Sequence, residues 1–204
     1  MQMTDMKSLW SRLEKWGQAN APSMLEDLNP GANNEDIALL EQKFGQILPE
    51  SLKACLRIHN GESDGWPCKV FADRGAFLST SRIVDEWAQR LEISDSLGGD
   101  DEMDREAQIR EGVIFVSGTV KPVMFDKAWI PIMECNGDVF WALDFNPADG
   151  GVEGQVIEVD WEGCSWTVIA HSFEKLMEDY VDDLESGAFR IDDGQPTKQR
   201  RFLT

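Results

Sequence analysis

Residues 120–157 read VKPVMFDKAWIPIMECNGDVFWALDFNPADGGVEGQVI, and this stretch decides the fold. Segments 129–133 and 139–143 are rich in β-branched and aromatic residues, and the Asn136-Gly137 pair between them supplies positive φ easily. These features predict a β-hairpin. Turn formers at 144–151 then interrupt the sheet, and residues 154–159 resume it. Three strands therefore follow one another closely, as in an antiparallel meander.

Pro131 lies inside the first of these strands and has no N–H to donate to a neighbouring strand. We therefore expect this strand at the edge of the sheet, or the proline at a point where its missing N–H would face solvent.

Apolar periodicity places helices and further strands around this meander. The order is helices, then consecutive strands, then a helix, which predicts an α+β fold: a mostly antiparallel sheet packed with helices and covered on one side. The expected helices span residues 6–17, 34–45, 48–60, 80–91, 103–110 and 172–187, and the expected additional strands span 69–71, 113–116 and 165–170.

The chain has 204 residues, and no linker divides it. We expect one domain over residues 1–191 and a short, loosely held basic tail over 192–204, which contains Lys198-Gln199-Arg200-Arg201. The apolar runs are far shorter than the ~20 residues that cross a bilayer, and no signal-like block opens the chain. These features predict a cytoplasmic location and no membrane partner.

Charge restricts the class of partner. The chain carries 38 acidic and 19 basic residues, a net charge of −19 at neutral pH. Such a surface repels nucleic acid and anionic lipid, because their affinity for proteins depends on Lys and Arg. A partner with a basic surface would instead be steered in. The alternative interpretation is that acidity only keeps the protein soluble.

Several short motifs occur in a characteristic order along the chain. Residues 48–52 read LPESL and 79–87 read STSRIVDEW, while 129–132 read WIPI and 143–147 read LDFNP. In this order they resemble the first class of the SUKH superfamily, with similarity over roughly residues 10–191. That class includes fungal Smi/Knr cell-wall assembly regulators and many bacterial toxin-immunity proteins.

The resemblance implies a Smi/Knr-like (SUKH) fold and a non-enzymatic, protein-binding role. The leading hypothesis is an immunity protein that neutralises a cognate toxin of a polymorphic toxin system, a nuclease for example. The alternative is a regulatory scaffold or adaptor like the cell-wall regulators. Those regulators carry long disordered arms, and this chain has short ends.

Residues suited to catalysis are scarce. The two histidines, His59 and His171, adjoin a helix end and a helix cap, so we expect structural roles for both, His59 on the terminal carbonyls of its helix. The four cysteines form no C-x-x-C pair, which favours reduced thiols with Cys55 on a buried face. Asp144, Asn146 and Asp149 only vaguely resemble a Ca²⁺ loop, and a turn held by side-chain acceptors is favoured. The sequence therefore predicts no enzyme, no cofactor and no metal.

An interface with a basic toxin domain would use acidic residues for steering and aromatic residues as anchors. Tryptophans that close the edge of a core are the alternative interpretation. The acidic outer face of the last helix would add to the steering. The candidate partner-binding residues are Trp66, Glu92, Asp95, Asp100, Asp101, Glu102, Asp104 and Trp161.

Overall fold

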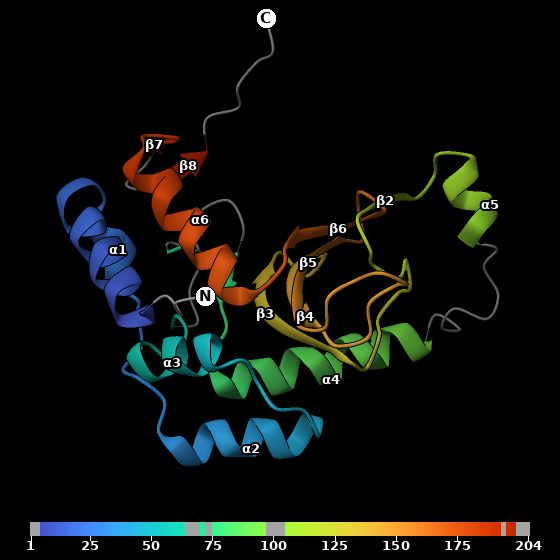
Figure 1. Ribbon diagram of the computed structural model, residues 1–204, viewed down its shortest axis with the longest axis horizontal. Helices are drawn as coiled ribbons and strands as arrows, with labels where there is room; N and C mark the ends of the chain where they lie inside the picture. Colours follow the sequence, from blue (N-terminus) through green and yellow to red (C-terminus); the bar gives the residue numbers. More distant parts are fainter. Residues whose placement is uncertain (1–4, 64–69, 72–74, 97–104, 193–194, 199–204) are drawn as a thin grey trace, which may run out of the picture.

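The computed structural model describes residues 5–63, 70–71, 75–96, 105–192 and 195–198 (Figure 1). It confirms the predicted α+β fold. The helices are α1 (Met6–Asn20), α2 (Asn34–Phe44), α3 (Glu50–Ile58), α4 (Thr80–Ser96), α5 (Arg105–Arg110) and α6 (Phe173–Glu185), with a 3-10 helix, η1, at Pro22–Leu25. The strands are β1 (Ala76–Phe77), β2 (Phe115–Ser117), β3 (Trp129–Cys135), β4 (Val139–Asp144), β5 (Gln155–Asp160), β6 (Ser165–Ala170), β7 (Phe189–Asp192) and β8 (Gln195–Lys198).

The six-stranded sheet has the order β1-β3-β4-β5-β6-β2. Every neighbouring pair is antiparallel except β2 and β6, which run parallel. The predicted hairpin is β3–β4, and its turn residues Asn136 and Gly137 have φ of 49° and 83°. These two positive φ values are what a tight hairpin turn requires, so the Asn-Gly pair sets this turn.

The edge beside β3 differs from expectation. The two-residue β1 lies outside β3, so β3 is not the edge strand, but β1 pairs only with Met133 and Glu134 and stops short of Pro131. The expected strand near residue 70 is also absent, because Val70 and Phe71 lie in a turn and residue 69 is outside the described ranges. The Val70 N–H donates to the Glu62 carboxylate at 3.1 Å instead of to a strand.

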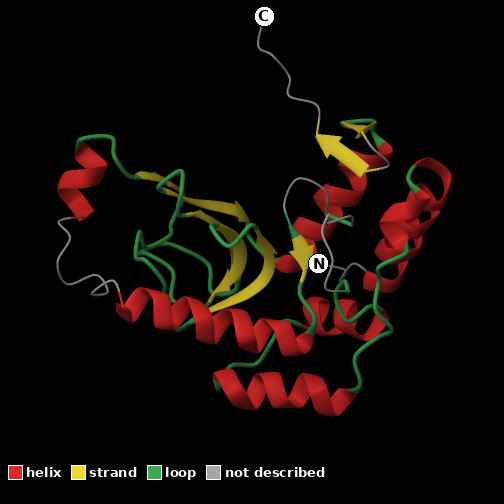
Figure 2. Ribbon diagram, turned by 180° about the vertical axis from the view of Figure 1, so that it is seen from behind, coloured by secondary structure: helices red, strands yellow, loops and turns green. Residues whose placement is uncertain are grey.

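Both faces of the sheet are covered, not one as expected. One face packs against α6, which in turn packs against α1 and α3, and the other packs against Ile114, Val120, Phe125 and the outer half of α4 (Figures 1 and 2). All residues from Trp129 to Met133 are buried, and successive side chains of a strand point to opposite faces. This strand therefore packs into two hydrophobic cores, one on each face of the sheet.

The first helix runs past Gly17 to Asn20, so Gly17 does not end it. This glycine is buried against η1, and a Cβ there would lie 3.1 Å from the sulfur of Met24. It serves close packing rather than termination. Asn33 and Ser172 accept N-cap hydrogen bonds at the starts of α2 and α6, and Gly45 after α2 is left-handed with φ 63°.

The LDFNP motif holds three strands together. The buried Asp144 carboxylate accepts hydrogen bonds from the Trp129 indole at 3.1 Å, the Asn146 N–H at 2.9 Å and the Gln155 amide at 3.0 Å. These residues come from the WIPI, LDFNP and GQVI segments of the sequence. The motifs therefore meet at Asp144, and its bond from the Asn146 N–H confirms the predicted turn held by a side-chain acceptor.

The chain does not end its regular structure at residue 191. Strands β7 and β8 pair in an antiparallel two-stranded sheet beyond α6, so part of the segment expected to form a tail is a strand. The single-domain boundary at 191 remains a prediction.

Candidate protein-binding groove

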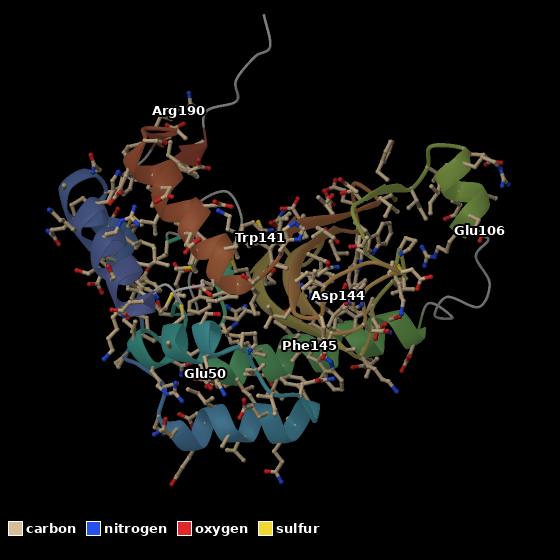
Figure 3. The ribbon with its side chains drawn as sticks, in the orientation of Figure 1. Glu50, Glu106, Trp141, Asp144, Phe145 and Arg190 are labelled. Atoms are coloured by element: carbon tan, nitrogen blue, oxygen red, sulfur yellow. The ribbon has the colours of Figure 1, made fainter. Side chains whose placement is uncertain are left out.

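A row of side chains crosses three strands on the face of the sheet that is turned toward α6. Trp141 on β4 pairs with Glu158 on β5, which pairs with Thr167 on β6. Residues paired in this way project from the same face of a sheet. Figure 3 shows Trp141 between the sheet and α6. This row forms the floor of a groove.

One side of α6 forms the wall of the groove. Leu176, Asp179, Tyr180 and Asp183 recur at helical spacing and so lie on the same side of the helix. The enclosed space has a volume of about 480 Å³, within the range of ~300–1,000 Å³ for ligand pockets. It is lined by Trp141, Glu158, Thr167, Val168, Ile169, Leu176, Asp179, Tyr180, Asp182, Asp183 and Phe189.

Aromatic packing fixes the apolar part of this groove. The Tyr180 ring packs edge-on to Phe189 with centroids 5.5 Å apart, and its other neighbour Phe71 lies at 5.1 Å. The Tyr180 hydroxyl donates to the Val70 carbonyl, and the Trp141 indole donates to Glu158 at 2.8 Å. These contacts hold the rings in place, so the groove is preformed.

The groove is acidic as well as apolar. Four carboxylates line it, and among its lining residues in the described part of the chain none is Lys or Arg. Arg12 of α1 bonds Asp182 at 2.7 Å and Glu185 at 2.6 Å, and Lys175 bonds Asp179 at 2.7 Å. The Arg12 guanidinium holds the pKa of Glu185 below its usual value, mainly by hydrogen bonding. Exposed pairs of this kind are weak and screened, so they can exchange for pairs with a ligand.

The acidic residues singled out from the sequence lie elsewhere. Glu92 and Asp95 are exposed on the last turns of α4, at the end of the molecule opposite α6 (Figure 1). Trp66, Asp100, Asp101, Glu102 and Asp104 lie outside the described residues. A role for these residues in partner binding remains a prediction.

Trp161 packs at the edge of the second core. Its indole N–H donates to the Met124 carbonyl at 3.0 Å, and its ring meets Phe140 edge-on at 5.6 Å. This geometry matches the alternative interpretation, a tryptophan that closes a core edge. An anchoring role for Trp161 remains a prediction.

One wall of the groove was indicated by the sequence. The acidic outer face of the last helix, which includes Asp179, Asp182 and Asp183, was expected to steer a partner. The floor residues Trp141, Glu158 and Thr167 were missed, because only strand register brings them into one row. The available signal was Glu158, a carboxylate within an otherwise apolar strand segment.

His59 and Cys55 are held by contacts inside the fold. His59 contacts the Asn29 carbonyl at 3.1 Å and the Glu14 carboxylate at 2.8 Å, not the terminal carbonyls of its own helix as expected. His171 is exposed beside the α6 cap. Burial raises the pKa of the Cys55 thiol to about 12, while the Trp10 indole donates to its sulfur at 3.0 Å. A thiol this hard to ionise is a poor nucleophile.

Within the described ranges, no group of three or more His, Cys, Asp or Glu side chains is arranged to hold a metal ion. None of the helices in those ranges combines the length and apolar character that crossing a bilayer requires.

The arrangement of sheet and helices is that of an α+β protein. The sequence profile of the SMI1 / KNR4 family (SUKH-1) matches residues 31–179, and the chain belongs to this family.

The proteins to which this chain is similar include fungal regulators. The glucan synthesis regulatory protein of Neurospora crassa is 24% identical over 96% of this chain and 41% of that protein. The cell wall assembly regulator SMI1 of Saccharomyces cerevisiae is 22% identical over 90% of this chain and 41% of that protein. Human F-box only protein 3 is 35% identical over 57 residues, 28% of this chain and 12% of that protein. The chain thus spans about two fifths of the length of the regulators.

Proposed function

We propose that this chain is a regulatory protein-binding domain that holds a segment of another protein in the acidic groove, and that it does so in the cytoplasm without catalysis. The observation that carries the proposal is the groove itself, a preformed site in which the apolar side chains Trp141, Tyr180 and Phe189 lie beside four carboxylates. The family relatives support it, because they are named as regulators and not as enzymes.

The groove suits a segment with alternating apolar and basic side chains. The rings of Tyr180 and Phe189 offer the kind of rigid aromatic surface on which interface anchors pack. The carboxylates of α6 would attract Lys or Arg and raise the association rate at low salt. Rim contacts would extend the interface toward the ~1,600 Å² of a standard complex.

Affinity purification of three tagged proteins tests the proposal. Asp179→Arg places a cation on the groove wall, while Asp85→Arg makes the same charge change on an exposed position of α4. We expect partners that the wild type and Asp85→Arg retain to be lost from Asp179→Arg, with direct binding of each then measured by titration. Equal recovery by all three proteins would contradict the proposal.

Toxin immunity is the second candidate function. The net charge of −19 suits a basic toxin domain, and the SUKH class includes immunity proteins. The relatives named above are regulators, so the comparisons favour the scaffold or adaptor function. Co-expression with a toxin domain encoded beside this gene separates the two: rescue of growth supports immunity, and continued killing supports regulation.

A further inference from the structure

We propose that the basic segment Lys198–Thr204, with the sequence KQRRFLT, occupies the acidic groove of its own molecule. The inference does not depend on the proposed function, because a contact between this segment and the groove would hold even if no partner bound there.

The exit point of the segment is fixed by strand register. Lys198, the last residue of β8, pairs with Phe189 of β7. Phe189 in turn lines the groove and packs against Tyr180 of α6. The chain therefore leaves its last described strand beside the groove wall.

The remaining length is sufficient. Six residues follow Lys198 and can span up to about 20 Å when extended, at ~3.3 Å each. Along α6, the wall from Asp183 back to Leu176 corresponds to about 10 Å, since a helix rises ~1.5 Å per residue. The segment can thus follow the wall over its whole length.

The order of chemistry along the segment matches the order along the groove. Lys198, Arg200 and Arg201 come first, and Phe202 and Leu203 follow. Near the exit, the wall presents Asp182 and Asp183. Further along it presents Leu176 with Ile169 on the neighbouring strand. Cations would meet carboxylates first, and the apolar residues would then reach the apolar end.

Tethering makes even a weak contact effective. A short linker gives an effective concentration in the millimolar range, so a millimolar intrinsic affinity already fills the groove part of the time. An external segment of similar chemistry would have to displace the internal one. The internal segment would thereby reduce affinity for external ligands.

Amide NMR spectra of the full chain test the contact. The variant Arg200→Glu/Arg201→Glu should shift the amide signals of groove residues, chiefly Thr167–Ile169, Asp179–Asp183 and Phe189. Arg110→Glu is the control for a charge reversal on an exposed arginine, placed on α5 at the other end of the molecule (Figure 1). It should leave those signals unchanged.

A synthetic KQRRFLT peptide completes the test. Added to the Arg200→Glu/Arg201→Glu protein, it should move the same groove signals back toward the wild-type positions, with a Kd near the millimolar range that weakens several-fold as salt rises. Adding Asp179→Arg to this protein should weaken that binding several-fold, whereas adding Asp85→Arg should not. Shifts confined to residues 195–204, shifts clustered on another surface, or a peptide without effect would overturn the proposal.

Discussion

The main difference between the carboxylates of α6 and the Arg90–Glu86 pair of α4 is their exposure to solvent. On α6, Asp182 and Glu185 retain 65% and 43% side-chain exposure while they pair with Arg12. On α4, Arg90 is 2% exposed and pairs with Glu86 at 3.2 Å. The same residue types therefore remain accessible to solvent in one region and are built into the core in the other.

The buried pair on α4 holds the second core closed. The Arg90 guanidinium lies 4.0 Å above the Phe140 ring and donates to the Gly137 carbonyl at 3.0 Å, so it ties α4 to the β3–β4 turn. Burial lowers the pKa of Arg90 and raises the pKa of Glu86. The cost of desolvating this pair thus exceeds the attraction between its charges. Arg90 therefore stabilises the fold through its packing on Phe140 and its hydrogen bond to Gly137 rather than through the ion pair.

The largest expected effect is on Arg90. Arg90→Ala removes the closer of the two arginines that pair with the mostly buried Glu86, leaving Arg82 at 3.5 Å, and empties the space above Phe140, so it should lower the free energy of unfolding by about 3–5 kcal/mol. Urea unfolding followed by tryptophan fluorescence measures this loss. Arg82→Ala is the control, because Arg82 reaches the same Glu86 at 3.5 Å from a site with 25% exposure, and it should cost less. Equal losses would remove the distinction between the buried and exposed clusters.

Asp144 gives the second largest effect, with a pH dependence. Asp144→Asn preserves an acceptor for Trp129 and Asn146 but sets an amide against Gln155, which should cost about 1–3 kcal/mol.

Burial raises the pKa of Asp144 above that of the unfolded chain, although its hydrogen bonds lower it. Protonated Asp144 therefore adds stability that is complete below the unfolded pKa of about 4 and is lost as pH rises through the folded value. The stability difference between wild type and Asp144→Asn should shrink as pH rises from about 4 toward 7, by about 1.4 kcal/mol for each unit of pKa shift. Unfolding curves across that range check the sign. A difference that widens with pH would show that the hydrogen bonds outweigh burial.

The smallest stability effect is on Arg12. Arg12→Ala removes an exposed guanidinium, so Tm should fall by no more than about 3 °C. The same change makes the groove more acidic, and binding of a basic peptide should strengthen, most clearly at low salt. Differential scanning fluorimetry and peptide titration measure the two effects. A large fall in Tm would instead assign the exposed pairs on α6 a structural role.

Local features were predictable from the sequence. The β3–β4 hairpin follows from two apolar segments around Asn136-Gly137, because turn geometry depends only on neighbouring residues. The α+β class and the SUKH resemblance are confirmed as well. The Ser172 cap of α6 is another local signal that the structure confirms.

Non-local features were not predictable. Val70 turns away from a strand because Glu62 captures its N–H, and Gly17 stays helical because η1 packs against it. Arg90 occurs on a helix with polar neighbours in sequence, and nothing local indicates that it lies under Phe140. These outcomes depend on residues that are distant along the chain.

The central meander, the Ser172 cap, the family and the excess of negative charge are readable from the sequence, because each depends on nearby residues or on composition. Only the folded chain shows that Arg90 is buried against Glu86 and that other carboxylates line the groove with Trp141 and Tyr180. The physical reason is that strand register and helix docking set the distance and the solvent exposure of side chains, and these two quantities determine whether a charge stabilises the fold or remains available for binding.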